Sequence, residues 1–494
     1  MPSIALPVSL RGQLLSGSRF SPLSLFATSE PGVWLDPSDL TTMFQDTAGT
    51  TPVTTPGQTV ALMLDKSRGL TLGTEYVTNA ADREFTSDTG FWSKEGGATI
   101  SGGVVNINNA SGTAPIYRFN FPNTSGGYVE IAFDLVLSAG AVQIVYGTAV
   151  SQTFSASGRI TVRLYRSAVG TFGIRATGGS TAIGTIDNIS VKELPGFHAT
   201  QATTASRPTY GIVPLGGRRN LLLATDTMAT QSLTVAAVAH TLAFTGTGTV
   251  TLTGASIAGP LIGTGASNRV SLTFTPTAAS LTLTVVGSVT LAQLETGSTA
   301  TAYQRVTTQY DVTEAGVQSL SYLSFDGVDD FLVTPTITPG IDKAQVFVGV
   351  RKLSDAARGT IVEHSATIAS NNGSFHLTAP NAASATFGFE SKGTTLTDAV
   401  ATFAAPTTRV VTGIGDIAGD STIIRANGTQ QDQDTADQGT GNFLAYPIYI
   451  GRRGGTTLPF NGQIYNMIVR FGANLDAGTI TSTETFVNGK TGAF

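Results

Sequence analysis

Apolar and polar residues alternate along most of this chain, and that alternation is the period of a β-strand with one buried face. Ile160, Val162 and Leu164 share one face of a predicted strand, and residues 270–274 and 281–285 repeat the pattern. Threonine and valine dominate these stretches, because β-branched side chains fit a pleated surface. Turn residues such as Gly, Pro and Asn-Gly recur between them, so the sequence predicts an all-β protein.

Helical periodicity is rare in this sequence. The two best stretches are residues 37–44, with Asp36 or Ser38 as an N-terminal cap, and residues 477–488. The apolar stretches have the length of strands and fall far short of the ~20 residues that a membrane-spanning helix needs. We therefore expect no membrane insertion.

Composition narrows the classes of function. The chain has 494 residues and no cysteine, which excludes a disulfide scaffold, a cysteine metal site and a cysteine nucleophile. Only 12% of the residues are charged and the formal net charge is −5, whereas nucleic-acid-binding domains usually present a basic face. We expect about three domains and no nucleic-acid partner.

Two segments carry recurring motifs at their ends. Residues 71–195 contain an early Phe-Trp pair at 91–92 and close with Ile-Asp-Asn-Ile-Ser-Val at 186–191. Residues 216–306 close with Ala-Gln-Leu-Glu at 292–295. Both segments resemble the jelly-roll modules, related to carbohydrate-binding modules, that recur in structural proteins of tailed phages. We name them the first module and the second module.

The remaining chain resembles one further domain. Ser-Phe-Asp-Gly-Val-Asp-Asp-Phe at 324–331, Tyr-Ile-Gly-Arg-Arg-Gly-Gly at 449–455 and Phe-Asn-Gly-Gln-Ile at 460–464 carry the resemblance. They are similar to the opening hairpin and penultimate strands of a laminin-G/concanavalin-like sandwich. Residues 34–40 resemble the leading segment of such sandwiches. The expected fold class is therefore a laminin-G/concanavalin-like β-sandwich with two inserted jelly-roll β-sandwich modules.

The order of these motifs predicts a sandwich domain in three pieces. The pieces are residues 31–70, 196–215 and 307–494, with one module inserted in each interruption. Insertion into exposed loops is tolerated because the chain ends of a small domain often lie close together. The alternative is a series of separate domains, with residues 196–215 as a linker. Residues 1–30 are expected to form a docking arm for another virion protein, or a terminus without that role.

The sequence contains neither a paired-carboxylate strand nor a nucleophile elbow, the two hydrolase motifs considered for this chain. A concanavalin-like hydrolase needs two carboxylates that project from one strand into a groove, and no Glu-x-Asp-x-x-Glu strand exists here. Glu363 and Glu390 are isolated acids, which we interpret as solvated strand-edge residues. A Ser-His-Asp triad is not excluded by composition, but the chain has no Gly-x-Ser-x-Gly elbow. We expect no enzyme.

The resemblance implies two sites for calcium, the one cofactor that we expect. Carboxylate oxygens suit this hard cation. In the hairpin at 324–331, the alternative is an ordinary turn, since Asp-Gly tolerates positive φ. Tyr465 stands where many relatives carry an acid, which departs from the family pattern. The implied calcium residues are Asn79, Asp82 and Asp187 in the first module, and Asp326, Asp329 and Asp330 in the hairpin.

The resemblance also implies sugar binding, for which exposed aromatic rings provide stacking faces. Trp34 and Trp92 lie in the opening motifs and are expected in the cores. The second module has few charged residues and one tyrosine near its end, which favours a spacer or protein-contact role. The candidate sugar-binding residues are Tyr117, Tyr128, Tyr146 and Tyr165.

These resemblances imply a non-enzymatic virion protein of a tailed phage, as a fibre, spike or decoration protein that adheres to cell-surface glycans. Its implied partners are other virion proteins, further copies of the same chain in a homo-oligomer, and the glycan. Two alternatives stay open: a purely architectural protein whose modules contact only other virion proteins, and a polysaccharide depolymerase.

Overall fold

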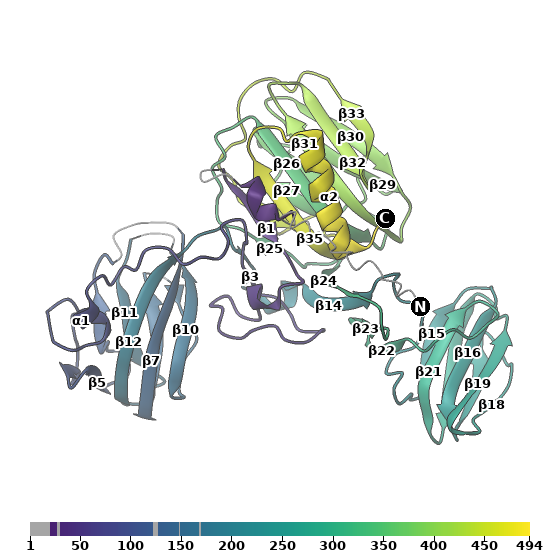
Figure 1. Cartoon of the computed structure of the whole chain (residues 1–494), viewed down its shortest axis with the longest axis horizontal. Coiled ribbons are helices and arrows are strands. Elements are labelled where there is room, and N and C mark those ends of the chain that lie inside the picture. Colours follow the sequence, from purple (N-terminus) through teal and green to yellow (C-terminus); the bar gives the residue numbers. More distant parts are fainter. Residues whose placement is uncertain (1–19, 27–29, 122–126, 148, 167–168) are drawn as a thin grey trace, which may run out of the picture.

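The computed structural model describes residues 20–26, 30–121, 127–147, 149–166 and 169–494. The docking arm expected over residues 1–30 falls largely outside the described residues. The described residues form three lobes that are built almost entirely of strands, so the predicted all-β class is confirmed (Figure 1). None of the helices in the described part has the length and apolar character needed to cross a bilayer.

Two large sheets form what we call the body, which comprises the upper lobe of Figure 1 and the strands below it that lead toward the two lower lobes. The first runs in the order β22 (Arg305–Thr308), β23 (Asp311–Thr313), β14 (Thr209–Pro214), β24 (Ser319–Asp326), β35 (Asn461–Phe471), β26 (Lys343–Lys352), β31 (Thr407–Asp416), β32 (Ser421–Ala426) and β33 (Thr429–Asp434), and β1 (Gly32–Leu35) also pairs with β35. The second runs β2 (Met43–Phe44), β3 (Leu62–Met63), β13 (Ala199–Thr200), β25 (Leu332–Val333), β34 (Ile448–Ile450), β27 (Thr360–His364), β28 (Ser374–Thr378), β29 (Thr386–Lys392) and β30 (Leu396–Thr402).

Stretches far apart in the sequence share these two sheets. Trp34 in β1 stands opposite Ile468 in β35, and β13 lies between β3 and β25. A Cβ on Gly32 would come within 2.4 Å of the carbonyl oxygen of Val469, so β1 approaches β35 as closely as it does because residue 32 is glycine. One apolar core, to which Val33, Ala199 and Val469 all contribute, fills the body.

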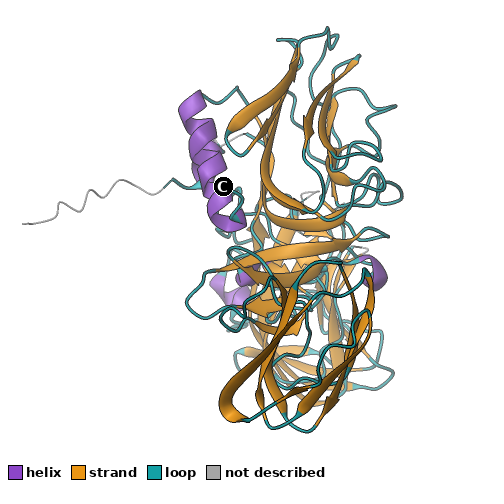
Figure 2. Cartoon of the chain, turned by 90° about the vertical axis from the view of Figure 1, so that its right-hand side faces the viewer, coloured by secondary structure: helices purple, strands orange, loops and turns teal. Residues whose placement is uncertain are grey.

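Helices are few, and they agree only partly with the sequence-based expectation. Helix α2 (Ala477–Thr491) spans the predicted stretch, begins at the N-cap Asp476 and ends at Gly492 with φ +63°. Figure 2 shows it lying along the outside of the body. The helix predicted over residues 37–44 is wrong, because only the 3₁₀ turn η2 (Leu40–Thr42) forms before β2 begins.

Described residues near the N-terminus pack onto the body. The 3₁₀ turn η1 (Pro22–Leu25) buries Leu25 in a small apolar cluster that also holds Phe26, Trp34 and Val487. The guanidinium of Arg470 donates from Nε to the carbonyl oxygen of Leu25 at 3.1 Å. Trp34 is therefore a core residue, as the sequence predicts.

The first module forms the left lobe of Figure 1 as two facing sheets around its own core. Trp92 lies in this core, as expected. A one-turn helix, α1 (Ala80–Arg83), precedes the strands. One sheet runs β10 (Gly158–Tyr165), β7 (Tyr128–Ala139), β12 (Ala182–Leu194), β5 (Val104–Asn109) and β4 (Thr99–Ser101), and the other runs β6 (Ile116–Arg118), β11 (Phe172–Thr177), β8 (Ala141–Tyr146) and β9 (Ala149–Val150).

The first module is docked on the body through a packed contact. Arg163 of β10 donates from its backbone N–H to the Ala48 carbonyl at 2.7 Å and from Nη1 to the Gly49 carbonyl at 3.0 Å. The ring of Tyr128 lies 4.6 Å, between centroids, from that of His198. His198 is buried, and burial lowers its pKa to about 3, so His198 stays neutral at physiological pH. The body thus holds the first module in one orientation.

The second module is the right lobe of Figure 1 and has a third core. Asn220, fully buried at its base, donates from Nδ2 to the carbonyls of Ala292 and Gln304, both at 2.9 Å. The bond to Gln304 joins the chain segments that lead into and out of the module, and the bond to Ala292 ties the entering segment to the last strand of the module. One of its sheets runs in the order β15 (Gln231–Val235), β20 (Ala279–Val286), β17 (Thr249–Gly254) and β18 (Leu261–Ile262). The other runs in the order β19 (Gly265–Phe274), β16 (His240–Gly246) and β21 (Val289–Thr296). The 3₁₀ turn η3 (Thr204–Ser206) belongs to the body.

Candidate functional site

The outward surface of the sheet β6-β11-β8-β9 in the first module has the features of a binding site. Strand alternation turns Ile116, Ile144 and Ile174 into the core, and their neighbours therefore point outward. Cross-strand register places Tyr117 opposite Gly173, and Gly173 opposite Val145. We call this surface the open face.

A hollow of about 210 Å³ lies on the open face. Gly173 helps to form it, because a Cβ at this position would stand 3.0 Å from the Cβ of Tyr117. Phe119 is 66% exposed, and its ring meets that of Tyr117 edge-on with centroids 5.2 Å apart. The lining of the hollow includes Tyr117, Phe119, Val145, Gly173, Arg175 and Glu95.

Polar groups lie at the edges of this apolar hollow. Glu95 is exposed and accepts the backbone N–H of Ala114 at 2.9 Å through Oε2. Arg175 stands opposite Gln143 in the sheet. With its amide oxygen turned toward the guanidinium, Gln143 accepts from Arg175 Nε at 3.1 Å and also from Nη2. An apolar surface with a few fixed polar groups suits a ligand that has both apolar faces and hydroxyls.

The four tyrosines predicted to bind sugars lie in different places. Tyr117 is on the open face, as described. Tyr128 and Tyr146 are only 3% and 2% exposed, so the prediction of sugar stacking is wrong for both: their ring faces are buried. Tyr165 is half-buried against Tyr128, with ring centroids 5.2 Å apart, where the module meets the body. The structure therefore does not bring the four together.

The calcium residues predicted in the first module also have separate partners. Asn79 caps α1, with Oδ1 accepting the Ala81 N–H at 3.1 Å. Asp82 is buried and accepts the hydroxyl of Thr89. Asp187 accepts the N–H of the next residue at 2.7 Å. Within the described ranges, neither Asp82 nor Asp187 belongs to a group of three acidic or histidine side chains close enough to share an ion.

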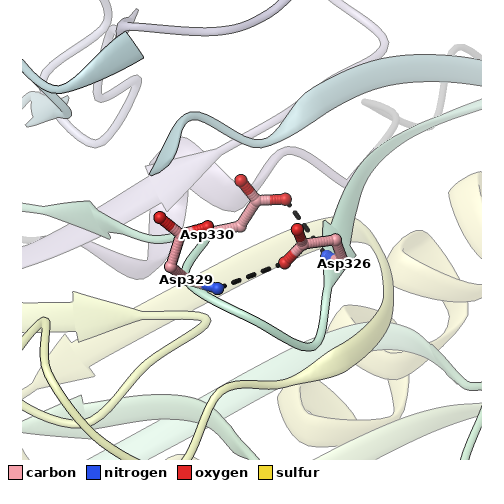
Figure 3. Close-up of side chains that lie close together, drawn as sticks. All are labelled: Asp326, Asp329 and Asp330. Carbon is pink, nitrogen blue, oxygen red and sulfur yellow. Dashed lines mark hydrogen bonds between the residues drawn. The ribbon is translucent and has the colours of Figure 1, made fainter. Parts of the chain in front are cut away.

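The hairpin acids are brought together. One carboxylate oxygen from each of Asp326, Asp329 and Asp330 lies within 4.8 Å of the others (Figure 3). The loop is also a tight turn, since Gly327 has φ +78° and Asp326 Oδ1 accepts the N–H groups of Val328 and Asp329 at 2.8 and 3.3 Å. Both sequence-based interpretations, the turn and the calcium site, are compatible with this geometry.

The electrostatics of this turn centre on Asp330. Burial, and then the charges of Asp326 and Asp329, raise its pKa to about 7. A bound cation would favour the charged form of Asp330, because its positive charge would offset the repulsion among the three carboxylates. The hydroxyl of Ser206 donates to Asp329 Oδ2 at 2.7 Å, which ties the turn to the segment around η3.

Sequence reasoning missed a buried charged network in the body. The interpretation of Glu363 and Glu390 as solvated residues is wrong, because Glu363 is fully buried and Glu390 almost so. Cross-strand register sets Glu363 opposite His376, and His376 opposite Glu390. Arg453 donates from Nε to Glu363 at 2.8 Å, and Arg358 donates from Nη2 to Glu390 at 2.6 Å.

The protonation of this network does not suit acid–base chemistry. Although burial opposes ionisation, hydrogen bonding and charge from His376 and Arg358 lower the pKa of Glu390 to about 2. Burial lowers the pKa of His376, although the neighbouring carboxylates oppose that shift. A general acid or base works best with a pKa near the working pH. Both Glu363 and Glu390 are held by arginines, which indicates a structural role.

Comparison with known proteins gave no matching family model and no matching curated protein. Among solved structures, the chain is similar to the CBM40 module of the Ruminococcus gnavus IT-sialidase bound to alpha2,3 sialyllactose, with 20% identity over 31% of this chain and 97% of that one (TM-score 0.25). It is also similar to the botulinum neurotoxin serotype D binding domain, with 13% identity over 33% of this chain and 42% of that one (TM-score 0.27). The chain thus spans less than half of the toxin domain.

Proposed function

We propose that this chain is a non-enzymatic structural protein of a tailed-phage particle, and that it binds cell-surface glycans through the open face of the first module. The observation that carries the proposal is the exposed ring of Phe119 beside the half-buried ring of Tyr117, at the hollow formed by Gly173. Apolar sugar faces pack on such rings, and Arg175 and Glu95 supply hydrogen bonds for hydroxyls. The virion assignment is supported by the motif resemblance in both modules and in the body.

Weak binding at one such site becomes useful when the chain is repeated. A homo-oligomer on a particle presents many copies of the open face at high effective concentration, so avidity exceeds the affinity of one site. The docked contact at Arg163 and Tyr128 supports this arrangement, because it fixes the direction in which each copy presents its open face.

A second proposed role is contact with other virion proteins through the second module. Ile257 is 87% exposed, and Ile262 and Val286 are exposed on either side of Thr249 in neighbouring strands. Exposed apolar side chains that gather on one module are typical of protein interfaces. In the purely architectural alternative, both modules contact only other virion proteins and the open face binds no sugar.

The test is a glycan-array measurement on the intact chain and its variants. We expect Phe119→Ala and Tyr117→Ala each to weaken binding at least tenfold, because each removes stacking area at the hollow. Phe494→Ala removes another exposed phenylalanine ring, outside the first module, and serves as the control. Absence of glycan binding by the intact chain would favour the architectural role, and release of reducing ends from host polysaccharide would favour the depolymerase.

A further inference from the structure

Arg175 lacks the carboxylate partner that Arg159 and Arg163 of the same module have. Arg159 pairs with Asp134 at 3.1 Å, and Arg163 pairs with Glu130 at 2.8 Å. Arg118 donates to a backbone carbonyl at 2.5 Å and stacks on a phenylalanine ring. Within the described residues, Arg175 has no carboxylate within 4.0 Å, and its hydrogen-bond partner is the neutral amide of Gln143.

The bonds from Gln143 hold the guanidinium in place without neutralising it. They engage Nε and Nη2, and within the described part of the chain Nη1 has no hydrogen-bond partner. Arg175 is half-buried in the wall of the hollow, beside the apolar floor formed by Val145 and Gly173. An oriented cation next to an apolar surface is a site for a planar anion, since the guanidinium fork matches a carboxylate.

The lining of the hollow also contains a negative charge, the carboxylate of Glu95. Glu95 is exposed, and it forms no ion pair with Arg175 in the described structure. Its carboxylate can accept hydrogen bonds from hydroxyls but repels an anion. A ligand that satisfies both groups therefore carries a carboxylate at one end and hydroxyl groups at the other.

We propose that the open face is selective for a carboxylated sugar, whose carboxylate pairs with Arg175, whose ring packs on Tyr117 and whose hydroxyls donate to Glu95. This inference rests on the proposed glycan-binding function and names the chemical class of the glycan. A sulfated sugar is the competing anion. The planar carboxylate fits the two-pronged guanidinium better than a tetrahedral sulfate does.

The experiment uses isothermal titration calorimetry on the intact chain with three probes: trigalacturonic acid, its fully methyl-esterified neutral form, and a sulfated trisaccharide. We expect the acid to bind at least tenfold more tightly than the ester. In Arg175→Gln the ratio of the two affinities should fall to near one, because a charge-assisted bond accounts for about ten- to a hundredfold in affinity. Arg175→Lys should give an intermediate ratio, since it keeps the charge and loses the fork.

Arg159→Gln is the matched control, because it removes an exposed arginine of the same module that already has a carboxylate partner. It should leave the ratio at the value of the unmodified chain. Equal binding of acid and ester would overturn the carboxylate inference and leave the glycan-binding proposal standing. Tighter binding of the sulfated probe would also overturn it. A chain that binds no glycan on the array would overturn the proposed function itself.

Discussion

Leu35→Ala tests whether the segment around Trp34 is an integral part of the body. Leu35 is the last residue of β1, is 3% exposed and stands opposite Met467 in β35. Its side chain lies in the same apolar core as Val346 and Phe471, so truncation leaves a cavity between strands more than 300 positions apart in the sequence. Leucine-to-alanine changes in cores cost about 2–5 kcal/mol.

The assay is amide hydrogen exchange followed by mass spectrometry. A loss of about 2–5 kcal/mol speeds exchange through unfolding by about 30- to 4,000-fold, since each 1.4 kcal/mol is a factor of about ten. We expect this acceleration in peptides covering β35 and β26, although the altered residue is in β1. Peptides from β16 in the second module, which has its own core, should exchange as before.

Leu40→Ala provides the control. Leu40 lies in the same segment but is exposed, so its truncation should change exchange in β35 by less than threefold. The reasoning is refuted if Leu35→Ala speeds exchange only near residues 32–35 and leaves β35 protected. That result would mean that the early segment contributes nothing to the stability of the late strands.

Two further predictions concern the charged groups of the body. The raised pKa of Asp330 means that its native-state carboxyl holds a proton that the unfolded state releases, so the stability contributed by Asp330 should fall as pH rises from about 4 to about 7. Buried His198, whose pKa is lowered to about 3, contributes with the opposite sign over this range, so the Asp330 contribution is measured as the difference in the free energy of unfolding between the unmodified chain and Asp330→Asn in urea titrations. Calcium at pH 8 should raise the melting temperature of the unmodified chain but not that of the variant. Glu390 has a lowered pKa of about 2, so the stability that it provides is present above about pH 4.5 and lost as pH falls toward 2. Glu390→Gln should lower the free energy of unfolding at pH 7 by about 3 kcal/mol, because Arg358 and His376 lose their carboxylate partner. Urea unfolding measures this change, and an unchanged midpoint of the urea transition would contradict the role of the buried network in stability.

Strand alternation in the sequence predicts both the fold class and which face of a strand is buried. Ile160, Val162 and Leu164 do share a strand, β10. The same rule applied to β8 places Tyr146 on the face of Val142 and Ile144, which is the core face. The position of Tyr146 in this alternation therefore predicts a buried ring, which cannot stack on a sugar.

The buried charged network and the hollow could not be predicted, because both depend on contacts between segments that are distant in the sequence. Every residue of β27 and β28 is buried, so the outer face of these strands is not solvated as alternation would suggest. Glu363 and His376 lie there side by side, and Glu363 pairs with Arg453, which comes from a loop distant in the sequence. The hollow on the open face depends on Gly173, because a side chain there would contact Tyr117. The sequence does not show that these two residues stand opposite each other in neighbouring strands.

The most direct test of the account is a crystal structure of the intact chain with a carboxylated oligosaccharide that binds it. We predict a sugar ring packed on Tyr117 and Phe119, with its carboxylate within hydrogen-bond distance of Arg175. A sugar bound to the body or to the second module, with the open face empty, would contradict the account.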